Sequence, residues 1–288
     1  MLTRIPEFYW KREIIDGYEY IYISDYAIAG FNKSEEFSVG RYDACIDEDG
    51  KLHSYSGYSP STNKNITQHR DAAKLLSDEF CMIDYRYFML QLLYLVEYAN
   101  YNSQSQLGNG IVSMRYTASD KAIIAGETTN TIVIATNDYF KVGQQIAIGT
   151  TVDGVSICKD RTITEIAEYS KDTTEGTAIT FDGEPVNIAI GNIIHACAQK
   201  EGGCDSLGMK SGCLANDSQH AVIYRGIENI FGNVFNWIDG LNIQEYQAYI
   251  CRNPEEYTSD KFDGSYIKLG YMNCQDCLLY TSDAADDK

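Results

Sequence analysis

The chain has 288 residues, of which 23 are Lys or Arg and 41 are Asp or Glu, and its formal net charge is -18. A charge this negative repels phosphate backbones and anionic membranes, so we expect no nucleic acid partner. The N-terminal residues form no apolar signal segment, and the longest apolar stretch, at 92–96, is too short to span a bilayer. We therefore expect no membrane insertion. The length of the chain suits one large domain with an inserted segment.

The nine cysteines are scattered and odd in number, which argues against a disulfide framework. The one C-x-x-C pair, Cys274 and Cys277, lacks the second pair that a structural zinc site needs. We expect a protein made in a reducing cytoplasm, with no metal and no cofactor. The 23 tyrosines fit two interpretations: their rings suit surfaces that meet sugars or proteins, and in alternating runs such as 18–23 they are ordinary strand residues.

Residues 8–57 alternate apolar and aromatic side chains in short runs that are interrupted by Asp-Gly pairs and single glycines. This pattern predicts strands joined by tight turns. The stretch 47–50 (Asp-Glu-Asp-Gly) has two interpretations, a hairpin turn or a calcium-binding loop, and it lacks the longer ligand series of an EF-hand.

Two helices are predicted, at 71–80 and 85–101. Apolar residues of the second recur at steps of three and four, and Asp84 is placed to cap its first turn. We expect this apolar stripe to be core; its members are Tyr85, Phe88, Met89, Leu92, Val96 and Ala99. We expect Glu97 to be a solvated charge on the outer face of the helix, the alternative being a functional carboxylate.

Residues 127–198 carry seven short β-type runs separated by Gly, Asp and Asn, which predict a small barrel or sandwich. The stretch 142–149 lacks the glycine spacing of a phosphate-binding loop. Cys204 and Cys213 could bind metal with His195 or His220. Ordinary loop and core thiols are favoured there, because four ligands at metal-type spacing cannot be assembled.

The segment at 224–242 (YRGIENIFGNVFNWIDGLN) is the most distinctive part of the chain, because it combines three glycines and four asparagines with bulky apolar residues. The glycines permit turns or close backbone approach, and the asparagine amides need hydrogen-bond partners wherever they are buried. We interpret the segment as a structural signature, whose members are Tyr224, Arg225, Gly226, Glu228, Asn229, Gly232, Asn233 and Trp237.

This signature resembles the formylglycine-generating enzyme (sulfatase-modifying factor) family, whose fold is an elaborated C-type lectin fold. The stretch 69–76 resembles the first helix of that family, and 84–104 (DYRYFMLQLLYLVEYANYNSQ) resembles the second. The pairing of 84–104 with the signature is also similar to structural proteins of bacteriophages and prophages that use a lectin-like fold at the virion surface. The resemblance implies an α+β fold with a C-type-lectin-like core at 1–126 and 201–276, interrupted by an inserted small all-β domain at 127–200.

The phage resemblance implies a non-enzymatic, tail-associated virion surface protein that is made in the host cytoplasm. Its expected partners are a bacterial surface glycan or protein receptor, other virion proteins and further copies of itself. In the family the recognition face follows the signature, which here implies the ligand-binding residues Asp239, Asn242, Tyr246, Tyr249, Arg252 and Tyr257. The alternative for these residues is exposed loop and strand positions that bind no ligand.

Two other functions stay open at this point. The enzymes of the family bind copper through a cysteine pair near an R-G-G-S-W-type strand, and no such strand follows Asn242. We therefore expect no catalytic residue, and we keep the oxidoreductase as an alternative beside a purely structural virion subunit. The tail at 277–288 begins with CLLYTSDAAD, which resembles a translated sequencing adapter, so we expect the natural C-terminus to be missing; the alternative is a genuine polar tail.

Overall fold

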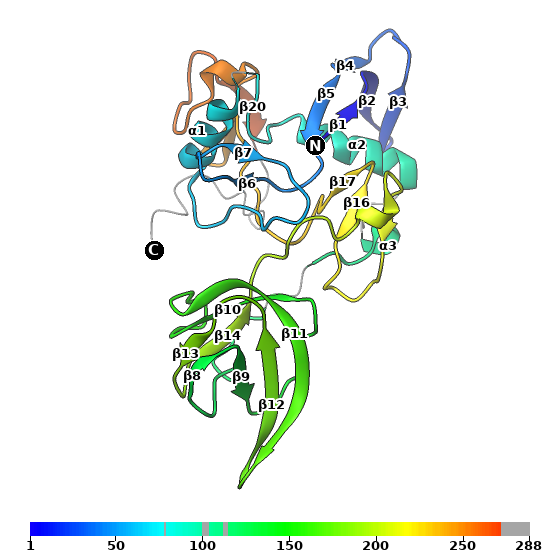
Figure 1. Ribbon diagram of the computed structural model, residues 1–288. Coiled ribbons are helices and arrows are strands. Elements are labelled where there is room, and N and C mark those ends of the chain that lie inside the picture. Colours follow the sequence, from blue (N-terminus) through cyan, green and yellow to red (C-terminus); the bar gives the residue numbers. More distant parts are fainter. Residues whose placement is uncertain (78, 100–103, 112–114, 272–288) are drawn as a thin grey trace.

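The computed structural model describes residues 1–77, 79–99, 104–111 and 115–271 (Figure 1). These ranges contain 20 β-strands and three α-helices, so the chain is a β-rich mixture of sheet and helix. The α+β class is confirmed at that level. The tail at 277–288 and the pair Cys274 and Cys277 lie outside the described residues.

The first strands follow the alternating pattern of residues 8–57. β1 (Leu2–Ile5) pairs antiparallel with β5 (Phe37–Gly40). β2 (Phe8–Ile15) lies between β3 (Tyr18–Ser24) and β4 (Asn32–Ser34) in a three-stranded sheet. The predicted Asp-Gly turn connects β2 to β3, with positive φ angles of 51° at Asp16 and 80° at Gly17.

A second hairpin joins β6 (Cys45–Ile46) to β7 (Leu52–His53). Its turn uses the Asp47 carboxylate: Oδ1 accepts the Lys51 N–H at 2.8 Å, and Oδ2 lies 2.7 Å from Nε2 of His53. These contacts favour the hairpin interpretation of 47–50 over a calcium-binding loop.

Two of the three helices match the predicted pair, with different ends. α1 (Ile66–Leu76) begins earlier than predicted because Asn65 and Gln68 form a capping box at its N-terminus. α2 (Tyr87–Tyr98) begins just after Asp84, whose Oδ1 accepts the Arg86 N–H at 2.9 Å. A short third helix, α3 (Gln104–Leu107), follows it. None of the helices in the described ranges is long and apolar enough to cross a membrane.

The predicted core stripe of α2 is wrong at Phe88 and Val96, although Met89, another of its members, packs against a buried cluster. The helix buries Leu90, Leu93 and Tyr94, whereas Phe88 and Val96 are 39% and 42% exposed. Because α2 is apolar on nearly every side, several stripes satisfy the same helical spacing. The neighbouring strands, and not the spacing, decide which of these stripes is buried.

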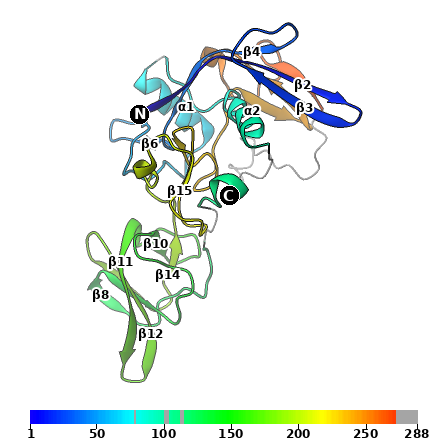
Figure 2. The ribbon, with the colours of Figure 1, turned by 90° about the vertical axis from the view of Figure 1, so that its right-hand side faces the viewer.

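Residues 126–196 form a group of strands that stands apart from the rest of the chain (Figures 1 and 2). The members are β8 (Gly126–Thr129), β9 (Thr131–Ile134), β10 (Gln145–Gly149), β11 (Cys158–Lys171), β12 (Thr174–Phe181), β13 (Val186–Ile188) and β14 (Ile193–Ala196). Five of them form a sheet of order β14-β10-β11-β12-β9, and β13 pairs with β8. A cluster of buried isoleucines fills this lobe. The predicted boundaries at 127 and 200 stay a prediction, and residues 121 and 122 already form β-bridges to Ile193 and Ile134.

The C-terminal part adds two three-stranded sheets. β15 (Gly212–Cys213), β16 (Val222–Tyr224) and β17 (Ile227–Glu228) form the first, and β18 (Leu241–Gln244), β19 (Gln247–Ile250) and β20 (Ile267–Tyr271) form the second. Short 3-10 helices lie at Asp205–Leu207 and Pro254–Glu256.

The signature begins at the last residue of β16, contains β17 and continues through irregular chain into the start of β18. Tyr224 packs edge-on against Tyr94 of α2, with ring centroids 5.6 Å apart. Trp237 packs against the cluster that contains Ile66 and Ala73 of α1. The signature therefore bridges the two long helices.

Candidate ligand-binding site

Buried polar groups of the signature hold the segment 199–204 in place. The side-chain amides of Asn229 and Asn233 donate to Oε1 of Glu201 at 2.9 and 2.8 Å. The Glu228 carboxylate accepts the backbone N–H groups of residues 202, 203 and 204 at 2.7, 2.9 and 2.8 Å. The expectation that buried asparagine amides find partners is confirmed for Asn233, 4% exposed, whose nitrogen and oxygen both have partners; Asn229, 1% exposed, has a partner for its nitrogen, while its Oδ1 has none among the described residues.

Glu201 is the residue of this network that the sequence did not single out. It is 2% exposed, and its Oε2 has no hydrogen-bond partner among the described residues. Burial raises the pKa of Glu201, and the nearby charges of Asp43 and Glu228 raise it further. The protonated form of Glu201 is therefore favoured in the folded protein.

Glu97 is a surface charge of α2, as expected, with its side chain 38% exposed, but it also has partners in the signature. Its Oε2 accepts the Tyr224 hydroxyl at 2.9 Å and lies 3.1 Å from Nε of Arg225. The helical spacing alone does not show these contacts with residues 224 and 225. Glu97 thus connects the second helix to the first two residues of the signature.

Three of the six predicted ligand-binding residues make hydrogen bonds inside the protein. Asp239, 1% exposed, forms a bidentate ion pair with Arg70, with both N–O distances at 2.8 Å. Tyr257, 4% exposed, donates its hydroxyl to Oδ2 of Asp84 at 2.9 Å. Asn242 donates its amide to the backbone carbonyls of residues 258 and 261, each at 3.0 Å. These contacts give the three side chains a structural role.

The other three predicted residues lie in or beside the sheet of β18, β19 and β20, and their side chains are at least partly exposed. Tyr246, in the turn between β18 and β19, is 69% exposed. Tyr249 is partly buried, with its ring 5.3 Å from that of Phe262 in an edge-on contact, and Arg252 is exposed. A ligand role for these residues stays a prediction.

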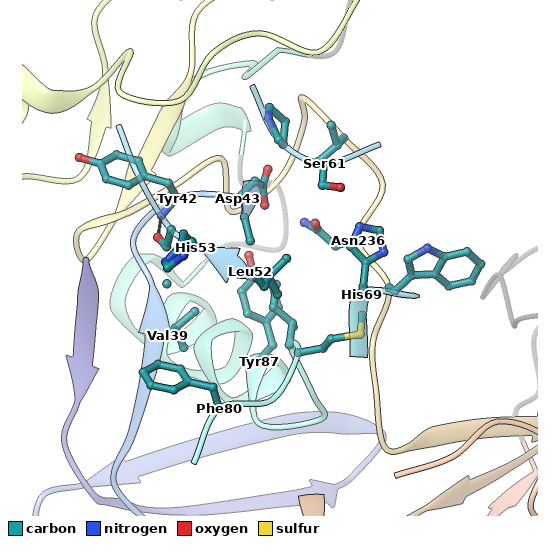
Figure 3. A pocket seen from close by; sticks show the side chains of 18 of the residues that line it. Val39, Tyr42, Asp43, Leu52, His53, Ser61, His69, Phe80, Tyr87 and Asn236 are labelled. Carbon is teal, nitrogen blue, oxygen red and sulfur yellow. Dashed lines mark hydrogen bonds between the residues drawn. The ribbon is translucent and has the colours of Figure 1, made fainter. Parts of the chain in front are cut away.

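A cavity of about 170 Å³ lies on the side of the signature that faces α1 (Figure 3). Its walls come from β5, β7, α1, and the segments 80–83 and 234–237. Five aromatic residues line it: Tyr42, Phe80, Tyr87, Phe235 and Trp237. A second cavity of about 320 Å³ shares the wall formed by Leu2, Val39 and Tyr87. An apolar cavity with a few polar groups is the usual form of a small-ligand site.

Asp43 is the main polar group of the first cavity. Figure 3 shows its carboxyl group close to the Asn236 side chain. The Asn236 side chain hydrogen-bonds the Asp43 carboxyl, while Oδ2 of Asp43 is buried and has no partner among the described residues. Burial raises the pKa of Asp43, and the charge of Glu228 contributes in the same direction.

His69 and Cys81 are the other ionisable side chains that matter for the chemistry of this cavity. Nδ1 of His69 is buried and has no partner among the described residues. Burial lowers the pKa of His69, so the neutral imidazole is favoured. Burial also raises the pKa of the Cys81 thiol to about 11, and Nη2 of Arg86 donates to its sulfur at 3.5 Å. Cys81 is thus a thiol, not a thiolate nucleophile, at neutral pH.

Neither Asp43 nor His69 was identified as a site residue from the sequence. Asp43 lies in irregular chain between two short strands, and His69 lies in a helix, so no motif marks either one. No group of three or more His, Cys, Asp or Glu residues in the described part of the chain is placed to hold a metal ion. The described cysteines are all free thiols.

Comparison of the chain with protein-family models, with curated proteins and with solved structures finds no match.

Proposed function

We propose that this chain is a non-enzymatic binding protein of a bacteriophage or prophage virion. In this proposal it has a C-type-lectin-like core, is associated with the tail, is made in the cytoplasm of the host, and attaches the virion to a glycan or protein of the bacterial surface. The amino-acid sequences of the segments 84–104 and 224–242 support the resemblance to lectin-like proteins. The packing of these two segments against each other through Tyr94 and Tyr224 supports it as well.

The observation that carries a binding function is the aromatic cavity beside the signature. It combines an apolar lining with two buried polar atoms that lack partners, Oδ2 of Asp43 and Nδ1 of His69. This arrangement suits recognition, because a ligand can satisfy atoms that the protein leaves unpaired. Catalysis is less well supported, because Cys81, the thiol in the lining, is held in its protonated form.

The test is retention of the labelled full chain on bacterial cells and on purified cell-wall glycans. We expect saturable retention on at least one surface. Tyr246→Ser should weaken that retention roughly tenfold, because exposed tyrosines often dominate binding interfaces. Tyr26→Ser is the matched control, since Tyr26 is 79% exposed and lies outside the predicted face.

If no surface retains the chain and the chain oxidises a cysteine peptide in a copper-dependent reaction, the oxidoreductase function is favoured over the binding function. Light scattering adds a second criterion: a closed oligomer is expected for a tail component, and a monomer would weaken every virion assignment. Equal retention of the Tyr246→Ser and Tyr26→Ser variants would place the receptor face outside the β18–β19 turn.

A further inference from the structure

We propose that the cavity beside the signature binds a compact organic ammonium ion, with a primary amine that donates to Oδ2 of Asp43 and an apolar body about the size of one six-membered ring. This inference rests on the proposed binding function and specifies the ligand class of the same site.

The first argument is the unpaired acceptor. Oδ2 of Asp43 is buried, and a buried carboxylate oxygen without a donor is costly to maintain. The residues that line the cavity include no Lys and no Arg, so no lining side chain supplies a permanent positive charge. A ligand that brings its own cationic donor completes the site, whereas a carboxylate or phosphate would be repelled by Asp43 and by Glu228, which also lines the cavity.

The second argument is the size and composition of the lining. A cavity of about 150 Å³ is enough to hold a benzene ring, so the volume of about 170 Å³ accommodates one ring with a short amine. Tyr87 and Trp237 contribute aromatic rings to the lining. Aromatic rings attract ammonium groups through their negative faces, and they do not attract anions in this way.

The third argument is the second unpaired atom. Nδ1 of His69 is buried without a partner, and the neutral imidazole that burial favours can accept a hydrogen bond there in one of its tautomers. A primary ammonium carries three N–H donors. His69 is therefore a second polar group of the same lining that a ligand donor can satisfy.

The charges around Asp43 set the direction of the pH dependence. The ionisable groups around it are Glu228 from β17, Glu201 from the segment 199–204 and Tyr87 from α2, and His69 from α1 lines the same cavity. The two carboxyl groups favour protonation of Asp43. Because the ammonium ion needs an ionised Asp43 and a neutral His69, its affinity should increase as the pH rises from about 5 to about 8.

The experiment is a titration of the full chain with benzylammonium and, separately, with the neutral analogue benzyl alcohol, followed by calorimetry or by chemical shifts. At pH 8 we expect benzylammonium to bind at least about tenfold more tightly than benzyl alcohol. A factor of about ten is what one hydrogen bond to a charged group contributes to affinity. Asp43→Asn should remove this preference. Asp172→Asn, which makes the same charge change at the exposed turn between β11 and β12, should leave it intact.

The comparison of the two probes on the unmodified protein does not depend on whether the Asp43→Asn variant folds. Equal affinities of the two probes, or an affinity for benzylammonium that falls with rising pH, would overturn the inference. If bacterial surfaces retain the chain while benzylammonium does not bind, the inference fails and the proposed function stands. If benzylammonium binds and no surface retains the chain, the ligand class stands and the host-attachment proposal fails.

Discussion

The ion pair between Arg70 and Asp239 should be one of the main stabilising contacts between α1 and the signature. Its two N–O distances are both 2.8 Å, and the side chains are 9% and 2% exposed. Asp239→Asn removes the negative charge with little change of shape and leaves the guanidinium of Arg70 buried without its partner. We expect the free energy of unfolding to fall by about 3–5 kcal/mol.

The magnitude follows from the burial and the geometry of the pair. At an effective dielectric constant of about 20, two unit charges 4 Å apart attract by about 4 kcal/mol. The exposed pair of Arg12 and Glu19 is the matched control, because its side chains are 61% and 27% exposed. Arg12→Met should therefore cost no more than about 1 kcal/mol.

The assay is chemical denaturation of the two single variants, Arg70→Met and Asp239→Asn, and of the double variant. The double variant should be more stable than the sum of the single losses predicts, because removal of both charges leaves neither one unpaired. Additive losses, or a loss in Asp239→Asn as small as that in Arg12→Met, would refute this account of the ion pair. Such a result would also reopen Asp239 as a ligand-binding residue.

Two further predictions concern the signature and its polar network. Gly232→Ala should destabilise the protein by at least about 1 kcal/mol more than Gly30→Ala in denaturation experiments. Both glycines have positive φ angles, 89° at Gly232 and 81° at Gly30. Of the two, only Gly232 would place an added Cβ against backbone, 2.9 Å from the carbonyl oxygen of Ile111. Equal losses would contradict the close approach. Glu201→Gln should change the pH dependence of stability: because the pKa of Glu201 is raised on folding, its stabilising contribution is present at about pH 4 and is lost as the pH rises toward the alkaline range. Unfolding measured at about pH 5 and pH 8 should show the variant gaining relative to the wild type at the higher pH, and parallel curves would show that Glu201 does not titrate as described.

Local sequence chemistry predicted much of the secondary structure. The Asp-Gly pair at 16–17 marks the turn between β2 and β3, and the glycines of the signature do adopt positive φ angles. The β runs between 127 and 198 became strands, and both long predicted helices exist. These features depend on neighbouring residues and on backbone sterics, which the sequence displays directly.

The cavity could not be predicted in the same way. Its polar contact joins Asp43 to Asn236, and neither residue lies in a pattern that points to the other. The six predicted ligand-binding residues were chosen because the family resemblance places the recognition face at the end of the signature and beyond it, and because their side chains are of types that bind ligands. Two of them, Asp239 and Tyr257, are buried against Arg70 and Asp84.

The sequence by itself determined the charge balance, the turns and the presence of the helices and strands. Only the tertiary structure decided which face of α2 is buried, which polar groups have partners and which two remain unpaired in a cavity. The physical reason is distance along the chain: Arg70 meets Asp239 across 169 residues, and the environment of such side chains exists only once the chain has returned on itself. Burial and the choice of hydrogen-bond partners set the pKa values and the binding chemistry, and both are properties of the folded chain.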